Sequence, residues 1–166
     1  MTIRDYAKSI VYGGMDGIVT TFAVVAGAVG GNLGIKPILI LGFSNLLADG
    51  FSMAVGDYLS STTEESAVKA KAVKNAGATF MSFITFGLIP LLSYLLINVF
   101  SLFKIHTFLI ACVLVSLALA LLGLVKAIIT GSSKKKEIFR PLLIGLIAAL
   151  FAYYVGEGLG KLAGTR

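Results

Sequence analysis

Five long runs of apolar residues make up most of this 166-residue chain and constrain its fold more than any other feature. A helix that crosses a hydrocarbon core of about 30 Å needs about 20 predominantly apolar residues. A strand of a membrane barrel needs about ten residues of alternating polarity, and these runs are longer and continuous. The sequence therefore predicts an all-α polytopic membrane protein. It forms a single transmembrane domain over residues 1–166, with helices at Ala7–Gly30, Pro37–Ser60, Ala78–Leu102, Thr107–Thr130 and Phe139–Leu159.

The cationic residues between these runs favour one orientation in the membrane. Nine lie on the side of the N-terminus, namely Arg4, Lys8, Lys69, Lys71, Lys74, Lys134, Lys135, Lys136 and Arg140. Four lie on the other side, namely Lys36, Lys104, Lys161 and Arg166. Because Lys and Arg accumulate in cytoplasmic loops, we expect a cytoplasmic N-terminus, a short cytoplasmic loop at residues 61–77 and an outside C-terminus. This distribution explains the net charge of +6, so we expect membrane lipid as a partner and no nucleic acid.

Two acidic residues lie inside the predicted spans, which is the most unusual feature of the sequence. Asp16 lies in the first span, and Asp49 lies near the middle of the second. A carboxylate in hydrocarbon costs several kcal/mol unless it faces a partner, water or an ion. A functional role for this pair is therefore the leading hypothesis, and a purely structural polar contact is the alternative.

The second span adds a polar stripe to this pair. Asn45, Asp49, Met53 and Asp57 recur every four residues and so share one face of the helix. Carboxylate and amide oxygens suit Mg²⁺, Ca²⁺ and Mn²⁺, whereas a thioether adds softness that Fe²⁺ accepts. Each residue also has a structural interpretation: Met53 fills a gap in the core, Asn45 forms an interhelical hydrogen bond, and Asp57 reaches water near the helix end.

Two further polar residues are candidates for the transport path. Thr20 stands one turn beyond Asp16, where its hydroxyl would orient the carboxylate or meet the ion. Glu157 lies near the outer end of the last span. It is either an exit site or an interfacial residue paired with Lys161, four positions on.

Pairs of glycines one turn apart predict close helix packing. They are Gly13 with Gly17, Gly27 with Gly31, and Gly156 with Gly160. Small residues at this spacing let the backbones of neighbouring helices approach closely. Five short helices are few to enclose a pathway, so we expect a homodimer whose route lies at the interface.

Two ordered runs resemble the vacuolar iron transporter family. Tyr12–Ala28 (YGGMDGIVTTFAVVAGA) is similar to its first helix, and Leu41–Ser60 (LGFSNLLADGFSMAVGDYLS) is similar to its second. The resemblance covers roughly the first 60 residues. It implies a five-helix dimeric transporter that moves Fe²⁺, often Mn²⁺ as well, out of the cytosol in exchange for protons, with no permanent cofactor. It also implies that Asp16, Asp49 and Met53 line the ion route between protomers.

The connection after the second span departs from the well-known members of that family. Those members carry a glutamate-rich cytosolic metal-binding domain here, whereas this chain has only Ser61–Gly77. It resembles the short, nodulin-like branch that lacks the domain. Glu64 and Glu65 remain, either attracting cations at the entrance or forming a solvated turn. The short chain and the missing domain favour a prokaryotic plasma membrane.

Three other classes of function compete with metal transport. In a proton-coupled transporter or channel for a different substrate, the acids would act only as proton relays. In a non-transporting membrane scaffold, the polar residues would only fix helix packing. An enzyme is the least expected class, because the polar residues offer neither a nucleophile–base pair nor a phosphate loop.

Overall fold

The computed structural model describes residues 3–63, 69–96 and 101–165. Within these ranges the regular secondary structure is entirely helical: α1 (Ile3–Gly30), α2 (Ile35–Thr62), α3 (Lys69–Gly87), α4 (Ile89–Leu95), α5 (Ser101–Thr130) and α6 (Lys134–Leu162). Five segments are long and apolar enough to cross a membrane: Tyr6–Gly30, Ile35–Thr62, Lys69–Leu95, His106–Thr130 and Lys134–Leu162. The prediction of an all-α membrane protein with five spans is confirmed.

The third span differs from the prediction at both ends. The prediction began it at Ala78, but α3 begins at Lys69, so the second half of the predicted loop 61–77 is helical. Lys and Ala dominate this stretch and are strong helix formers, whereas hydropathy marks only the part of a helix that lies in hydrocarbon. The prediction ended the span at Leu102, and that residue belongs to α5.

The third span is also divided, which the sequence analysis did not predict. α3 ends at Gly87 and α4 begins at Ile89, with Pro90 in its first turn. Proline has no backbone N–H to continue the helical ladder and is tolerated only at such a start. The last span is longer than predicted, because α6 begins at Lys134 rather than at Phe139.

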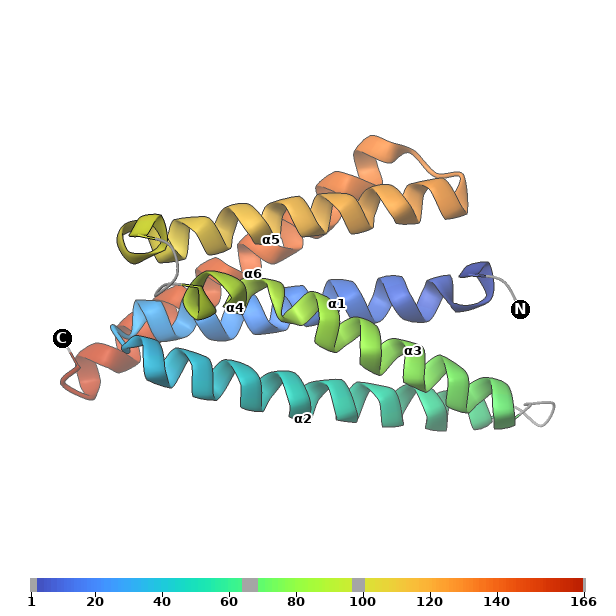
Figure 1. Ribbon diagram of the computed structural model, residues 1–166, viewed down its shortest axis with the longest axis horizontal. Helices are drawn as coiled ribbons and strands as arrows, with labels where there is room; N and C mark the ends of the chain where they lie inside the picture. The colour runs from blue at the N-terminus through green and yellow to red at the C-terminus, as the bar shows by residue number, and fades with distance from the viewer. Residues whose placement is uncertain (1–2, 64–68, 97–100, 166) are drawn as a thin grey trace.

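α1 lies at the centre of the bundle and contacts each of the other five helices (Figure 1). Its inward side chains, among them Ile18, Phe22 and Val25, are buried in the main hydrophobic cluster. The start of α1, the end of α2, the start of α3 and the α5–α6 turn lie at one end of the bundle in Figure 1, and the end of α6 lies at the other. We call these the N-terminal end and the C-terminal end.

Glycines allow α1 to approach two neighbours backbone to backbone. A methyl group at Gly13 would lie 2.6 Å from the carbonyl oxygen of Thr79 in α3, and one at Gly17 would collide with the backbone of Phe83. On the other side of α1, a methyl group at Gly27 would lie 3.3 Å from the Ala152 carbonyl oxygen of α6. One at Gly31 would lie 3.3 Å from the Gly156 carbonyl oxygen. The glycine pairs therefore pack helices within one protomer.

Candidate metal site in the first two helices

Asp16 of α1 and Asp49 of α2 lie on adjacent helices, and their negative charges interact. Both side chains are partly buried. Among the residues that the structure describes, neither carboxylate accepts a hydrogen bond or forms an ion pair. Two like charges inside a membrane span with no compensating donor are costly, which makes them a suitable pair of ligands for a cation.

The polar stripe of α2 runs along the edge of its packed face. Ile38, Gly42, Leu46 and Gly50 are buried against the bundle. The stripe residues Asn45, Asp49, Met53 and Asp57 are half-buried beside them. The side-chain nitrogen of Asn45 is buried and has no hydrogen-bond partner within the described ranges, so the interhelical hydrogen bond of the structural alternative is not formed by this nitrogen inside the protomer.

Beyond this stripe, α2 presents an unpacked face of small residues. Ser44, Ala48, Ser52, Gly56 and Ser60 recur every four residues and are all exposed in the single chain. A methyl group at Gly56 would meet nothing within 4 Å. The half-buried polar stripe therefore lies between the packed face of α2 and a face that a neighbouring helix backbone can approach closely.

Thr20 does not orient the carboxylate of Asp16. Its hydroxyl donates to the backbone carbonyl oxygen of Asp16 at 2.8 Å. Such a bond to the residue four positions back is a common way for Thr to satisfy its hydroxyl inside a helix. Thr20 thus keeps oxygen lone pairs available while its proton is engaged by the backbone.

Asp57 is held by hydroxyl groups from three helices. It accepts hydrogen bonds from Thr79 Oγ1 of α3 at 2.5 Å, Ser9 Oγ of α1 at 3.2 Å and Ser61 Oγ of α2 at 3.4 Å. The sequence analysis did not single out Ser9 or Thr79, because nothing local to either residue reveals a partner so far along the chain. The carboxylate ties the three helices together at the N-terminal end of the bundle.

Of the remaining candidates, the structure describes only Glu157, which is paired near the end of α6. Glu157 Oε1 lies 3.1 Å from Lys161 Nζ, so the ion pair that was one of the two alternatives for this residue is formed. Glu64 and Glu65 lie outside the described residues. Within the described part of one chain, no three His, Cys, Asp or Glu side chains gather as a metal-binding group.

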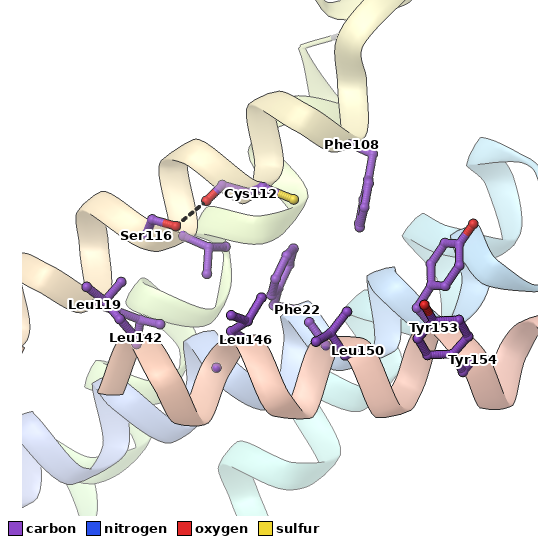
Figure 2. A pocket seen from close by; sticks show the side chains of 13 residues that line it. Phe22, Phe108, Cys112, Ser116, Leu119, Leu142, Leu146, Leu150, Tyr153 and Tyr154 are labelled. Carbon is purple, nitrogen blue, oxygen red and sulfur yellow. Dashed lines mark hydrogen bonds between the residues drawn. The ribbon is translucent and has the colours of Figure 1, made fainter. Parts of the chain in front are cut away.

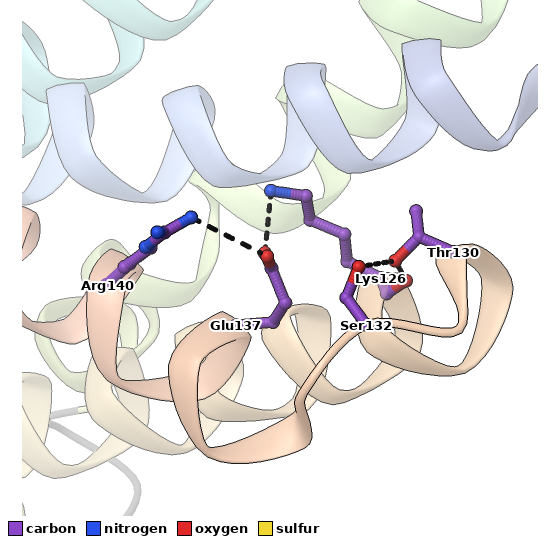
Figure 3. A network of polar contacts seen from close by, with 5 residues as sticks. All are labelled: Lys126, Thr130, Ser132, Glu137 and Arg140. Carbon is purple, nitrogen blue, oxygen red and sulfur yellow. Dashed lines mark hydrogen bonds and ion pairs between the residues drawn. The ribbon is translucent and has the colours of Figure 1, made fainter.

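A second charged cluster was missed by the sequence analysis. Glu137, only 8% exposed, lies in the first turn of α6. Its Oε2 is 2.7 Å from Lys126 Nζ of α5, and its Oε1 is 3.8 Å from Arg140 Nη1. Figure 3 shows both cations pointing toward this carboxylate. The sequence offered two separate signals, an acid directly after three lysines (Glu137) and an isolated Lys126 inside the preceding apolar run.

An apolar cleft between α5 and α6, of 340 Å³, opens on the side of α1 away from α2. Figure 2 shows Phe22, Phe108 and Tyr153 around one part of it and Leu119 with Leu142 at the other. The rings of Phe22 and Phe108 stack with their centroids 6.0 Å apart. None of its lining residues in the described ranges is charged, and Cys112 is the single thiol among them.

Comparison with known proteins agrees with this arrangement. The model of the VIT family matches residues 7–72 and 65–157, and the first of these segments contains both Asp16 and the α2 stripe. A vacuolar iron transporter of Toxoplasma gondii is 50% identical over 70 residues, which are 42% of this chain and 23% of that relative.

Two other relatives align over nearly the whole chain. A vacuolar iron transporter of Plasmodium berghei is 27% identical over 223 residues, covering 92% of this chain and 82% of the relative. Vacuolar iron transporter homolog 4 of Arabidopsis thaliana is 24% identical over 187 residues, covering 99% of this chain and 90% of the relative.

Proposed function

Because the chain belongs to the VIT family, we propose that it carries a divalent transition metal ion, Fe²⁺ or Mn²⁺, out of the cytosol in exchange for protons. The observation that carries this proposal is the pair of uncompensated carboxylates, Asp16 and Asp49, on adjacent membrane-spanning helices. The relatives described above are vacuolar iron transporters by name, which agrees with a metal as the transported substrate.

Met53 supplies the argument for a transition metal. It lies one turn beyond Asp49 on the same half-buried stripe of α2. Oxygen ligands alone would serve Mg²⁺ or Ca²⁺ equally well. A thioether gives the site a soft ligand, which favours Fe²⁺ over those harder ions.

A homodimer would complete the site. The small-residue face of α2 is where a second copy would pack, since its exposed Ser, Ala and Gly side chains allow close approach. A two-fold axis through this face would bring Asp16, Asp49 and Met53 of both protomers toward one route. The second copy would also cover the unpartnered nitrogen of Asn45.

Proton exchange follows from the chemistry of the ligand set. Metal binding requires deprotonated carboxylates, so metal and protons compete for the same oxygens. When no metal is bound, carboxylates that share a low-dielectric site cannot all remain ionised, so some of them bind protons. Release of the metal would therefore be accompanied by proton uptake, which is an antiport cycle with no permanent cofactor.

The decisive experiment is metal flux in proteoliposomes with Fe²⁺, Mn²⁺, Co²⁺ and Zn²⁺, with and without a pH gradient. Asp16→Asn and Asp49→Asn should each abolish uptake of Fe²⁺ and Mn²⁺. Glu157→Gln tests the exit-site alternative: retained uptake would leave this acid to its ion pair with Lys161, and lost uptake would place it in the route. Unchanged flux in the Asp16 and Asp49 variants would refute the metal site, and flux indifferent to the pH gradient would refute the antiport.

A further inference from the structure

A groove between α1 and α5 carries two lysines on apolar walls. It has a volume of 410 Å³, within the range of about 300–1,000 Å³ typical of small-molecule sites. Ala7, Val11 and Ile129 contribute apolar lining, and Lys8 and Lys126 contribute charge. We call it the α1–α5 groove.

The groove lies at the N-terminal end of the bundle and extends into membrane-spanning segments. Its α1 residues belong to the span Tyr6–Gly30, and its α5 residues belong to the last turns of the span His106–Thr130. One end of the groove therefore meets the membrane surface, while its apolar walls face acyl chains. A ligand that fits such a place has an anionic head and a hydrocarbon tail.

The charges around the groove leave a positive excess. Lys126 is paired with Glu137, which also attracts Arg140 (Figure 3). Lys8 is exposed and forms no ion pair with any described residue. The Glu137 carboxylate thus fixes the position of Lys126 without neutralising the whole group.

The cations of the following turn strengthen this field. The α5–α6 turn leads from Thr130, a residue of the groove, directly to Lys134, Lys135 and Lys136, all exposed. Basic pockets between membrane helices on the cytoplasmic side are suited to anionic headgroups. The α5–α6 cleft lacks charged lining residues in the described ranges and offers a headgroup no such partner.

We propose that the α1–α5 groove binds one anionic phospholipid. An acyl chain lies along Ala7, Val11 and Ile129, and the phosphate lies between the ammonium groups of Lys8 and Lys126. The site is separate from Asp16 and Asp49, so it does not depend on which ion the protein carries.

Native mass spectrometry and thermal unfolding of the full-length chain test this proposal. Phosphatidylglycerol should be retained in preference to phosphatidylcholine with the same acyl chains, and should raise the melting temperature more. Lys8→Gln should weaken phosphatidylglycerol binding about fivefold, the usual contribution of one lysine at an anionic surface. Lys36→Gln, an exposed lysine at the other end of the bundle, is the matched control and should leave binding unchanged.

Two further variants separate headgroup from chain. Lys126→Gln alone would leave Glu137 without its partner, so the double variant Lys126→Gln/Glu137→Gln is used. It should lose the preference for phosphatidylglycerol while remaining folded in phosphatidylcholine. Ile129→Trp places a larger side chain in the space that the acyl chain would occupy, so it should weaken retention of the lipid.

Three results would overturn the proposal. In the first, Lys8→Gln leaves phosphatidylglycerol binding unchanged. In the second, Lys36→Gln weakens binding as much as Lys8→Gln, which would assign the effect to overall charge. In the third, inorganic phosphate alone raises the melting temperature as much as the lipid, which would assign the groove to a free anion.

Discussion

The hydroxyl of Thr79 in α3 donates a hydrogen bond to the carboxylate of Asp57 in α2 over 2.5 Å. Ser9 of α1 donates to the same carboxylate oxygen. One acidic side chain therefore holds three membrane-spanning helices at the N-terminal end of the bundle, close to where a metal ion would enter from the cytosol in the proposed orientation.

Replacing Asp57 should destabilise the fold. In Asp57→Ala the hydroxyls of Ser9 and Thr79 lose their acceptor, which should cost about 1–3 kcal/mol of unfolding free energy. Thermal unfolding in detergent, followed by circular dichroism, measures the loss. Thr62→Ala is the control, because the Thr62 hydroxyl bonds back to the carbonyls of Tyr58 and Leu59 in its own helix and joins no second helix in the described ranges. Unchanged stability with lost flux would assign Asp57 to the ion route instead.

Gly17 of α1 should not tolerate a side chain. In Gly17→Ala the new methyl group collides with the backbone of Phe83, which cannot rotate away, so we expect a loss of about 1–3 kcal/mol. Gly77→Ala in α3 is the matched control, because a methyl group there meets nothing within 4 Å. It should raise stability by about 0.5–1 kcal/mol through helix propensity. Equal effects of the two variants would contradict the backbone contact.

The proposed dimer can be tested by cross-linking. Cys112 is the single cysteine of the chain, so Cys112→Ser provides a cysteine-free background. Adding Ser52→Cys, on the small-residue face of α2, should give a disulfide-linked dimer under mild oxidation, since residues near a two-fold axis meet their own copies. Leu143→Cys on the exposed side of α6 should remain monomeric. Cross-linking at Leu143 but not at Ser52 would place the interface elsewhere.

Met53 should determine metal preference more than overall activity. Met53→Leu keeps the side-chain volume but removes the sulfur ligand, so uptake of Fe²⁺ should fall several-fold relative to uptake of Mn²⁺. Met81→Leu, on an exposed position of α3, should leave the ratio unchanged. Competition between the two metals in proteoliposomes measures the ratio. An unaltered ratio in Met53→Leu would remove sulfur from the ligand set.

The sequence located what hydropathy and polarity reveal locally. Continuous apolar runs predicted five spans, and isolated carboxylates inside two of them marked Asp16 and Asp49. Pairs of glycines predicted close packing, and the structure adds that α3 and α6 are the partners. The ion pair between Glu157 and Lys161 was one of two alternatives, because four residues along a helix are one turn.

Other features depend on contacts that no local pattern encodes. Asp57 finds Ser9 and Thr79 far away along the chain, so only the folded bundle reveals the cluster. Glu137 and Lys126 lie on successive helices, and only the α5–α6 turn brings their two side chains together. The sequence did not predict the start of α3 at Lys69, because hydropathy does not detect the part of a helix that continues into water.

The glycine contacts of α1 have a mechanical consequence. α1 touches α3 and α6 through backbone carbonyls, which cannot yield. At Gly42 and Gly50, α2 meets instead the side chains of Leu91 and Phe83, which can change rotamer. If the protein alternates between inward- and outward-open forms, we expect α2 to move against α3 and α4, while α1 stays fixed against α3 and α6. The fixed helix α1 then holds Asp16 in place, and movement of α2 brings Asp49 and Met53 closer to Asp16 or farther from it.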